Sequence, residues 1–210
     1  MAEKKNLSEL ATKYGTDKRP QDHNYTPMYE RMLGTIEVNS LLEIGLGNGA
    51  SLRMWLDYYR GKDIYCIELF GDENKNLWEE SDGIITGLNL IPGDSTLAET
   101  WEIVPNNLDA IVDDGEHHPD IQIATFMQGF SHLRKGGLYF IEDLHCNFTE
   151  LYTGGHDIFF PWLFDLIINQ ETPSLNYGGN FYLARRSMSE LVSQIYSYHI
   201  YKSVVIFEKA

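Results

Sequence analysis

Residues 40–59 read SLLEIGLGNGASLRMWLDYY. The first part, SLLEIG, is a short apolar run and predicts a buried strand, whereas SLRMWLDYY has the spacing of a helix. The glycines between them allow a sharp turn and let a ligand approach the backbone closely. A strand, a glycine turn and a helix in this order are typical of nucleotide-type cofactor sites at the carboxyl end of the first strand of a sheet.

The alternation of strands and helices continues toward the C-terminus. Further strands are predicted at 63–69, within 83–91, at 108–114 and at 137–143, and helices at 72–80, at 119–133 and at 158–169, with Pro161 in the first turn of the last. This alternation predicts an α/β fold, with a parallel sheet covered on both faces. Two strand-like runs, 194–200 and 203–209, predict an antiparallel hairpin added to that sheet, and residues 144–157 read as a long loop.

The sequence before residue 40 predicts two helices joined by a polar loop. Residues 6–14 have helical spacing that ends at Gly15, and residues 16–25 read as loop. Thr26 and the proline after it fit an N-cap followed by the first position of a helix that runs to about Leu33. We therefore divide the chain into an N-terminal helical extension, 1–39, and an α/β domain, 40–210.

Composition excludes several classes of protein. The 210 residues are 43% apolar, enough for a sizeable core, and no run of 18 uncharged apolar residues predicts a membrane span. The formal net charge of −15 repels phosphate backbones and argues against a nucleic-acid partner. No secretory signal is visible, and Cys66 and Cys146 read as reduced thiols, so we expect a cytoplasmic protein.

The glycine turn fits two cofactors. Gly45-x-Gly47-x-x-Ala50 matches the dinucleotide pattern of nicotinamide enzymes. With Glu43 included, the pattern instead resembles motif I of class I S-adenosylmethionine (SAM) methyltransferases. The C-terminal hairpin and the N-terminal helices also resemble that class and not a nicotinamide enzyme. Glu68 ends the next strand and offers a carboxylate to the hydroxyls of a ribose in either case.

The third strand is followed by Asp94 and Ser95. In SAM methyltransferases an acidic or polar residue at this place meets the adenine amino group. Asp94 fits equally the N-cap of a helix that begins near Thr96, and both roles are compatible.

Acidic residues follow two neighbouring strands. Asp113 and Asp114 end the fourth predicted strand, and Glu142 and Asp143 end the fifth. The carboxyl ends of both strands meet beside the cofactor, so the carboxylates would repel one another unless a cation lies between them. Oxygen ligands favour Mg²⁺ or another hard divalent cation, although the single residues also fit surface loops.

Three histidines accompany these acids. His117 follows Asp114 closely and is the best-placed general base for a hydroxyl whose pKa a metal ion lowers. His118 and His145 are the alternatives for this role. The three together leave open a zinc site, but no cysteine lies at ligand spacing.

Taken together, these features resemble the metal-dependent sugar O-methyltransferases of bacterial natural-product pathways, which include the macrolide 6-deoxyhexose methyltransferases. The segments that carry the resemblance are LATKYGTDK (10–18), YTPMYE (25–30), LLEIGLGNGASLRMW (41–55), IVDDGEHH (111–118), GGLYFIEDLH (136–145) and YKSVVIFEK (201–209). The resemblance implies a Rossmann-like class I methyltransferase fold. Its sheet would have seven mostly parallel strands in the order 3-2-1-4-5-7-6.

The resemblance also implies roles for single residues. Asp114, Glu142 and Asp143 would bind Mg²⁺, and His117, beside Asp114, would be the catalytic base. Glu116 stands where the family usually has Ser, which changes the local hydrogen bonding. The residues implied in cofactor binding are Tyr14, Thr16, Lys18, Glu43, Gly45, Gly47, Ser51, Glu68, Asp94, Ser95 and Asp113.

The implied function is SAM- and Mg²⁺-dependent methylation of a hydroxyl on a small molecule. The leading interpretation of the acceptor is a sugar on a natural product. Catechol or phenol methylation and a SAM-binding module without turnover are the alternatives. The aromatic residues after the fifth strand fit either an acceptor pocket or core packing: Phe148, Tyr152, Phe159, Phe160 and Trp162. The tyrosine-rich hairpin is compatible with self-association into a homo-oligomer and equally with packing inside the chain.

Overall fold

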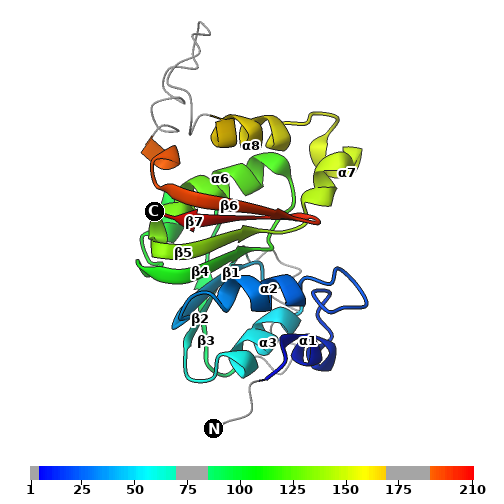
Figure 1. Ribbon diagram of the computed structural model, residues 1–210, viewed down its shortest axis with the longest axis vertical. Coiled ribbons are helices and arrows are strands. Elements are labelled where there is room, and N and C mark those ends of the chain that lie inside the picture. The colour runs from blue at the N-terminus through cyan, green and yellow to red at the C-terminus, as the bar shows by residue number, and fades with distance from the viewer. Residues whose placement is uncertain (1–4, 70–84, 169–189) are drawn as a thin grey trace, which may run out of the picture.

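The computed structural model describes residues 5–69, 85–168 and 190–210. Its seven-stranded sheet has the order β3-β2-β1-β4-β5-β7-β6 (Figure 1). β3, β2, β1, β4 and β5 pair in parallel, whereas β7 runs antiparallel to both β5 and β6. The predicted fold class, strand order and C-terminal hairpin are thereby confirmed. The helix predicted at 72–80 lies outside the described residues.

The strands are β1 (Ser40–Ile44), β2 (Asp63–Glu68), β3 (Leu88–Pro92), β4 (Leu108–Asp113), β5 (Leu133–Ile141), β6 (Ile195–Tyr201) and β7 (Val204–Lys209). The helices are α1 (Leu7–Tyr14), α2 (Thr26–Leu33), α3 (Ala50–Tyr58), α5 (Ala98–Trp101), α6 (Pro119–Gly129), α7 (Glu150–Thr153) and α8 (Phe159–Ile168). Two 3₁₀ helices, η1 (Phe130–His132) and η2 (Leu144–Phe148), flank β5.

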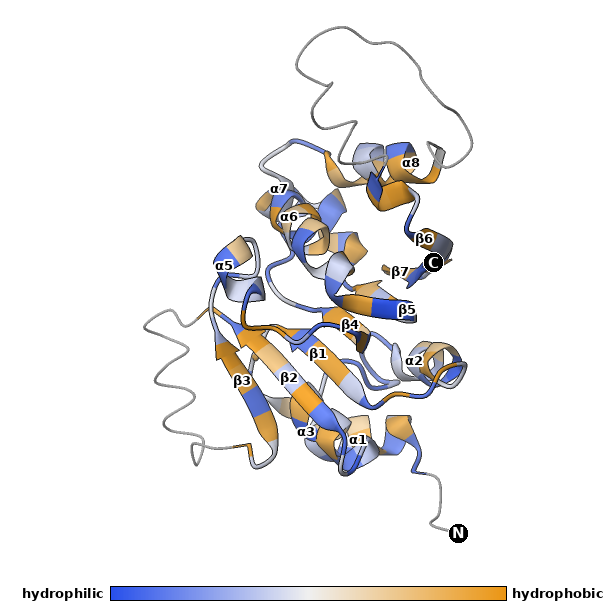
Figure 2. Ribbon diagram, turned by 90° about the vertical axis from the view of Figure 1, so that its left-hand side faces the viewer, coloured by the Kyte–Doolittle hydropathy of each residue, from blue (hydrophilic) through white to orange (hydrophobic). Residues whose placement is uncertain are grey.

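Helices cover both faces of the sheet (Figures 1 and 2). α1, α2 and α3 pack on one face, where Leu41 meets Tyr29 and Trp55 in one buried cluster. α5, α6 and α8 lie on the other, where Leu42 and Phe126 share a second cluster. Neighbouring strand residues serve opposite faces because side chains alternate along a strand. No described helix is long and apolar enough to cross a membrane.

The N-terminal helices form as predicted, with one difference. The Asn6 side chain caps α1, and Gly15, with φ of 74°, ends it. Thr26, however, is the first residue of α2 and not its N-cap, so that prediction was wrong. Its hydroxyl instead lies 2.6 Å from the Ser8 hydroxyl, and this bond joins α1 to α2.

Two further boundaries differ from the prediction. The helix expected over 119–133 ends at Gly129, and η1 leads directly into β5. A Cβ at Gly129 would lie 2.4 Å from the Trp101 ring, so the helix packs closely there. The loop expected over 144–157 was wrong in part, because it contains η2 and α7. Pro161 lies in the first turn of α8, as predicted.

The turn between β6 and β7 fixes the segment that follows β5. Ser203 adopts a left-handed φ of 65°, and its carbonyl oxygen accepts a hydrogen bond of 3.0 Å from the Leu144 amide. The Ser203 hydroxyl accepts another of 3.0 Å from the His145 amide. The C-terminal hairpin therefore holds the chain in place directly after Glu142 and Asp143, the two acidic residues that follow β5.

Asp109 joins the N-terminal ends of β1 and β4, two central strands of the sheet, at the opposite end of these strands from the acidic residues that follow β4 and β5. Its carboxylate accepts hydrogen bonds from the amides of Asn39 and Ser40, from the Ser40 hydroxyl and from the Arg134 guanidinium. Burial raises the pKa of Asp109, but the bonds from Arg134 and the two amides outweigh this effect and lower it.

We expect Asp109→Ala to lower the free energy of unfolding by about 2–3 kcal/mol in urea titrations, because these donors lose a charged acceptor. The loss should be complete above pH ~4 and shrink as the pH falls further, since the folded-state pKa is the lower one. Asp63→Ala, at an exposed position that begins β2, should change stability by less than ~0.5 kcal/mol. Equal stabilities of both variants would contradict this account.

Candidate functional site

The glycine turn after β1 is shaped by the neighbouring strand. Gly45 has φ of 96°, and a Cβ there would lie 2.3 Å from the carbonyl oxygen of Asp114, so only glycine fits. Gly47 has φ of 49°, and no described atom lies within 4 Å of where its Cβ would be. The turn thus touches the end of β4 on one side and leaves room for a ligand on the other.

Two buried carboxylates hold this turn. Glu68 ends β2, and its Oε2 accepts a hydrogen bond of 2.7 Å from the amide of Leu46. Glu43 lies inside β1 and accepts a bond of 2.9 Å from the Ser51 hydroxyl at the start of α3. Burial raises the pKa of Glu43 to about 7. The predicted cofactor residues of β1, β2 and α3 are therefore adjacent, and their contacts with a cofactor stay a prediction.

Three carboxylates from neighbouring strands share one face of the sheet. Glu43, Asp114 and Glu142 all point toward the face covered by the N-terminal helices, where they surround the ammonium group of Lys18. Lys18 Nζ lies 2.9 Å from Glu142 Oε2 and 3.6 Å from Glu43 Oε1, and it donates to Asp114. Burial would lower the pKa of Lys18, but these charges raise it well above its usual value.

Glu142 is enclosed on all sides. Besides Lys18, the Tyr29 hydroxyl of α2 donates a hydrogen bond to its Oε1. Gln122 of α6 donates from the other face to the Glu142 carbonyl oxygen, at 2.9 Å. Burial raises the pKa of Glu142 well above its usual value. In the described structure this carboxylate therefore faces Lys18 and Tyr29.

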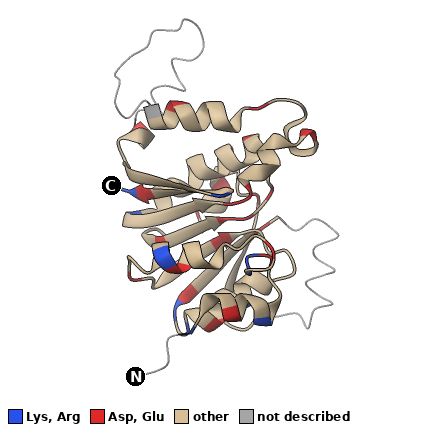
Figure 3. Ribbon diagram, turned by 45° about the vertical axis from the view of Figure 1, so that its right-hand side comes forward, with Lys and Arg blue, Asp and Glu red and all other residues tan. Residues whose placement is uncertain are grey.

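Asp114, His117 and Asp143 form a group whose side chains could hold a metal ion. Each offers one ligand atom, and these atoms all lie within 4.8 Å of one another. His117 Nε2 is 3.5 Å from Asp143 Oδ2, and His117 Nδ1 is buried without a hydrogen-bond partner among the described residues. Two carboxylates fit the ligand preference of Mg²⁺, and the acids gather just after the central strands (Figure 3).

Asp143 owes its orientation to an unusual backbone. Its φ of 56° is left-handed, which turns the residue out of the alternation of β5. The Tyr25 hydroxyl donates a hydrogen bond of 2.6 Å to the Asp143 Oδ1. Burial of Tyr25 raises its pKa, and this hydrogen bond raises it further. The N-terminal segment thus fixes this carboxylate toward His117.

Asp113 points to the opposite face of the sheet from its neighbour Asp114. It is buried, and burial raises its pKa to about 8. After β3, at the edge of the sheet, Asp94 Oδ1 accepts bonds from the amide and hydroxyl of Thr96, at 2.8 and 2.7 Å. The helix expected near Thr96 begins at Ala98 without a side-chain cap, so the N-cap interpretation of Asp94 was wrong.

The remaining predicted cofactor residues, Ser95, Thr16 and Tyr14, lie in three different places. Ser95 pairs with the Thr125 hydroxyl at 2.9 Å, on the α6 side of the sheet. Thr16 is buried next to Lys18. Tyr14 instead points toward α3, where its hydroxyl donates to Asp57 at 3.0 Å. The structure therefore does not bring Tyr14 to the carboxylate cluster.

The other two candidate histidines lie close to the candidate metal group, and His145 Nδ1 is 3.8 Å from Asp143 Oδ1. His118 Nε2 lies 3.6 Å from Glu116 Oε1, and His145 Nδ1 lies 2.7 Å from the Ser203 hydroxyl. In the described part of the chain, neither joins a group of three metal-ligating side chains. The zinc alternative thus has no support in the geometry.

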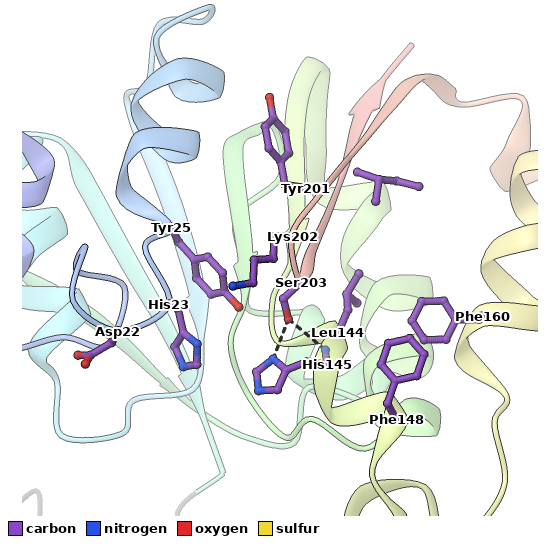
Figure 4. Close-up of a pocket in the computed structure, with 11 residues that line it drawn as sticks. Asp22, His23, Tyr25, Leu144, His145, Phe148, Phe160, Tyr201, Lys202 and Ser203 are labelled. Carbon is purple, nitrogen blue, oxygen red and sulfur yellow. Dashed lines mark hydrogen bonds between the residues drawn. The ribbon is translucent and has the colours of Figure 1, made fainter.

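A pocket of about 540 Å³ is lined in part by Tyr25 and His145, which both contact Asp143, although Asp143 itself does not line it (Figure 4). Phe148 and Phe160 stack at 4.8 Å on one wall, while His23 and Tyr25 stack at 5.2 Å on another. The sequence left open whether the aromatic residues after β5 are core or pocket, and the structure divides them: Phe159 is buried in the core. The pocket also has a side formed by Tyr201, Lys202 and Ser203 of the hairpin turn.

The two tyrosines of YTPMYE that donate hydrogen bonds to the acids, Tyr25 and Tyr29, were not predicted as site residues. Their spacing of four residues places them on one side of a helix, which was a usable signal. Lys202 and Ser203 of the pocket lie in a hairpin turn and carry no such signal.

Comparisons with known proteins give homologues of one kind. The chain is 29% identical to mycinamicin VI 2''-O-methyltransferase of Micromonospora griseorubida, over 98% of its own length and 53% of that protein's. It is 32% identical to demethylmacrocin O-methyltransferase of Streptomyces fradiae, over 73% of its own length and 40% of the other. The chain thus spans about half or less of these curated relatives. No protein-family profile matches it.

Among solved structures, MycE methyltransferase from the mycinamycin biosynthetic pathway, in complex with Mg, SAH and mycinamycin VI, matches with a TM-score of 0.79 and 26% identity. The match covers 100% of this chain and 56% of that one. A caffeoyl-CoA O-methyltransferase homologue from Staphylococcus aureus, with a TM-score of 0.55 and 14% identity, shares the fold alone.

Proposed function

We propose that this chain, a homologue of the O-methyltransferases of bacterial natural-product pathways with their Rossmann-like fold, transfers the methyl group of SAM to a hydroxyl of a small molecule with the help of Mg²⁺. The observation that carries this proposal is the convergence of Asp114, His117 and Asp143 beside the glycine turn. The MycE complexes, which hold Mg and SAH, support the same cofactors here.

In this proposal the residues have distinct tasks. Asp114 and Asp143 bind the divalent cation and orient the acceptor hydroxyl, and Glu142, the third proposed ligand, turns from Lys18 to do so. When bound, the cation lowers the pKa of that hydroxyl, which otherwise is a poor nucleophile. His117 removes the proton, since its ring lies 3.5 Å from Asp143 and its Nδ1 is unpartnered in the described structure.

The cofactor site is proposed at the glycine turn. The open space above Gly47 accommodates the methionine part of SAM, and Glu68 accepts hydrogen bonds from the ribose hydroxyls. Asp94 and Ser95, which follow β3, are proposed to contact the adenine, and Asp113, the last residue of β4, is proposed to lie near the cofactor.

The acceptor is proposed to be a sugar on an apolar scaffold. The pocket beside Asp143 combines stacked phenylalanines with histidine, tyrosine and lysine side chains, which suits a ligand with a hydrophobic part and hydroxyl groups. Methyl transfer from radiolabelled SAM to glycosylated macrolides, but not to catechol, is the expected assay result. Transfer to catechol alone would favour the phenolic alternative.

We expect Glu68→Ala to weaken S-adenosylhomocysteine binding about 10- to 100-fold in calorimetry, because a charged acceptor for the ribose is lost. The unchanged protein should bind S-adenosylhomocysteine and show no measurable preference for NAD. Glu37→Ala, at an exposed position before β1, is the control and should bind like the unchanged protein. Binding of NAD alone would contradict the proposed function.

A further inference from the structure

Lys18 is the one buried ammonium group in the described part of the chain, and it lies among proposed metal ligands. Its side chain is 0% exposed. It reaches carboxylates from three adjacent strands, at sequence separations of 96 residues to Asp114 and 124 to Glu142. A lysine is buried in this way only when its charge is paired, so the carboxylates and the ammonium group depend on each other.

The backbone of Lys18 is fixed as firmly as its side chain. Its carbonyl oxygen accepts hydrogen bonds of 3.0 Å from the amide of Tyr25 and 3.3 Å from that of Thr26, at the start of α2. The same helix start places the Tyr25 hydroxyl on Asp143. The loop before α2 therefore delivers a cation and a hydrogen-bond donor to the ends of β4 and β5 together.

Lys18 shares Asp114 with the candidate metal group. It donates to Asp114 Oδ2, and no described residue donates to the other oxygen of that carboxylate. A divalent cation bound by Asp114 would thus lie near a fixed positive charge. Like charges at this range repel, and the repulsion is strong where water is excluded.

We propose that the Lys18 ammonium group is a tethered cation of the site, which holds the Glu43, Asp114 and Glu142 carboxylates together without metal and weakens the binding of the divalent cation. Lys18 is then a positioning residue with an electrostatic task. This proposal rests on the proposed function in one respect, namely that a divalent metal ion binds beside the Lys18 ammonium group.

The test is Mg²⁺ calorimetry on protein dialysed against EDTA, without SAM, at pH 8.5. We expect Lys18→Met to bind Mg²⁺ at least about tenfold more tightly than the unchanged protein, because a nearby positive charge is gone. The double variant Lys18→Met/Glu43→Gln removes one charge of each sign and touches no proposed ligand, so its affinity should return to within about threefold of the unchanged protein. Lys13→Met, at an exposed ion pair on α1, is the matched control and should have no effect.

Thermal unfolding of the same metal-free proteins gives the second readout. Lys18→Met should melt about 10 °C lower than the unchanged protein, because breaking a buried ion pair leaves uncompensated charge. The double variant should recover most of that loss. If Lys18→Met folds only with Mg²⁺ present, the Mg²⁺ concentration at half folding replaces the calorimetric value.

Unchanged or weaker Mg²⁺ binding by Lys18→Met would overturn the proposal, as would a double variant no more stable than the single one. Failure of the proposed function appears differently, as an unchanged protein that binds no Mg²⁺ at all. In that case the melting temperatures alone decide whether Lys18 holds the carboxylates together.

Discussion

Asp143→Asn is expected to lower the rate of methyl transfer about 1,000-fold at saturating Mg²⁺, which corresponds to roughly 4 kcal/mol of transition-state stabilisation by a bound metal ion. The substitution removes the charge and keeps the shape. Asparagine tolerates the left-handed φ of 56° at this position, and its amide oxygen can still accept the bond from Tyr25. The loss should therefore come from metal binding and not from misfolding.

The measurement is the single-turnover rate with radiolabelled SAM, together with Mg²⁺ affinity. Asp120→Asn, at an exposed position in the first turn of α6, is the matched control and should retain the full rate. EDTA should reduce the unchanged protein to the level of the Asp143 variant. Full activity in EDTA, or an active Asp143→Asn protein, would contradict the metal-dependent account.

His117→Ala is expected to slow the chemical step by about 10²- to 10⁴-fold, the usual contribution of a positioned general base. Its affinity for S-adenosylhomocysteine should change little, because the imidazole lies beside Asp143 and not at the glycine turn. Single-turnover rates and calorimetry on the same preparation separate the two effects.

His118→Ala controls for a general effect of removing a histidine from this turn. The His118 Nε2 lies 3.6 Å from Glu116 Oε1, and the His118 ring centroid lies 5.6 Å from that of Tyr152. Loss of this ring should keep the rate of the chemical step within about threefold of that of the unchanged protein. If His117→Ala kept the full single-turnover rate, the base would have to be another group, with Asp114 and His118 the next candidates.

The topology could be predicted from the sequence because it depends on local patterns. Short apolar runs such as 40–45 alternate with helical spacing, and a parallel sheet follows from that alternation. The boundaries were less accurate where packing decides them, as at Gly129, where the Trp101 ring lies against the helix end. The short helices after β5 lack the length that makes a periodic pattern readable.

The candidate site could be predicted only in part, for a physical reason. The ends of β4 and β5 had to meet, so the gathering of their acids followed from the topology. Their directions did not, because Asp143 leaves the strand alternation at a left-handed φ. The burial of Lys18 beside Asp114 and Glu142, which are 96 and 124 residues away, left no local signal in the sequence.

Anomalous diffraction from a crystal soaked with Mn²⁺ and S-adenosylhomocysteine is the most direct test of the central claim, that Asp114 and Asp143 hold a hard divalent cation beside the cofactor. The account predicts one strong peak within coordination distance of both carboxylates, about 2–2.5 Å from their oxygens, with the cofactor at the glycine turn. Bound cofactor with no peak between these two residues would contradict it.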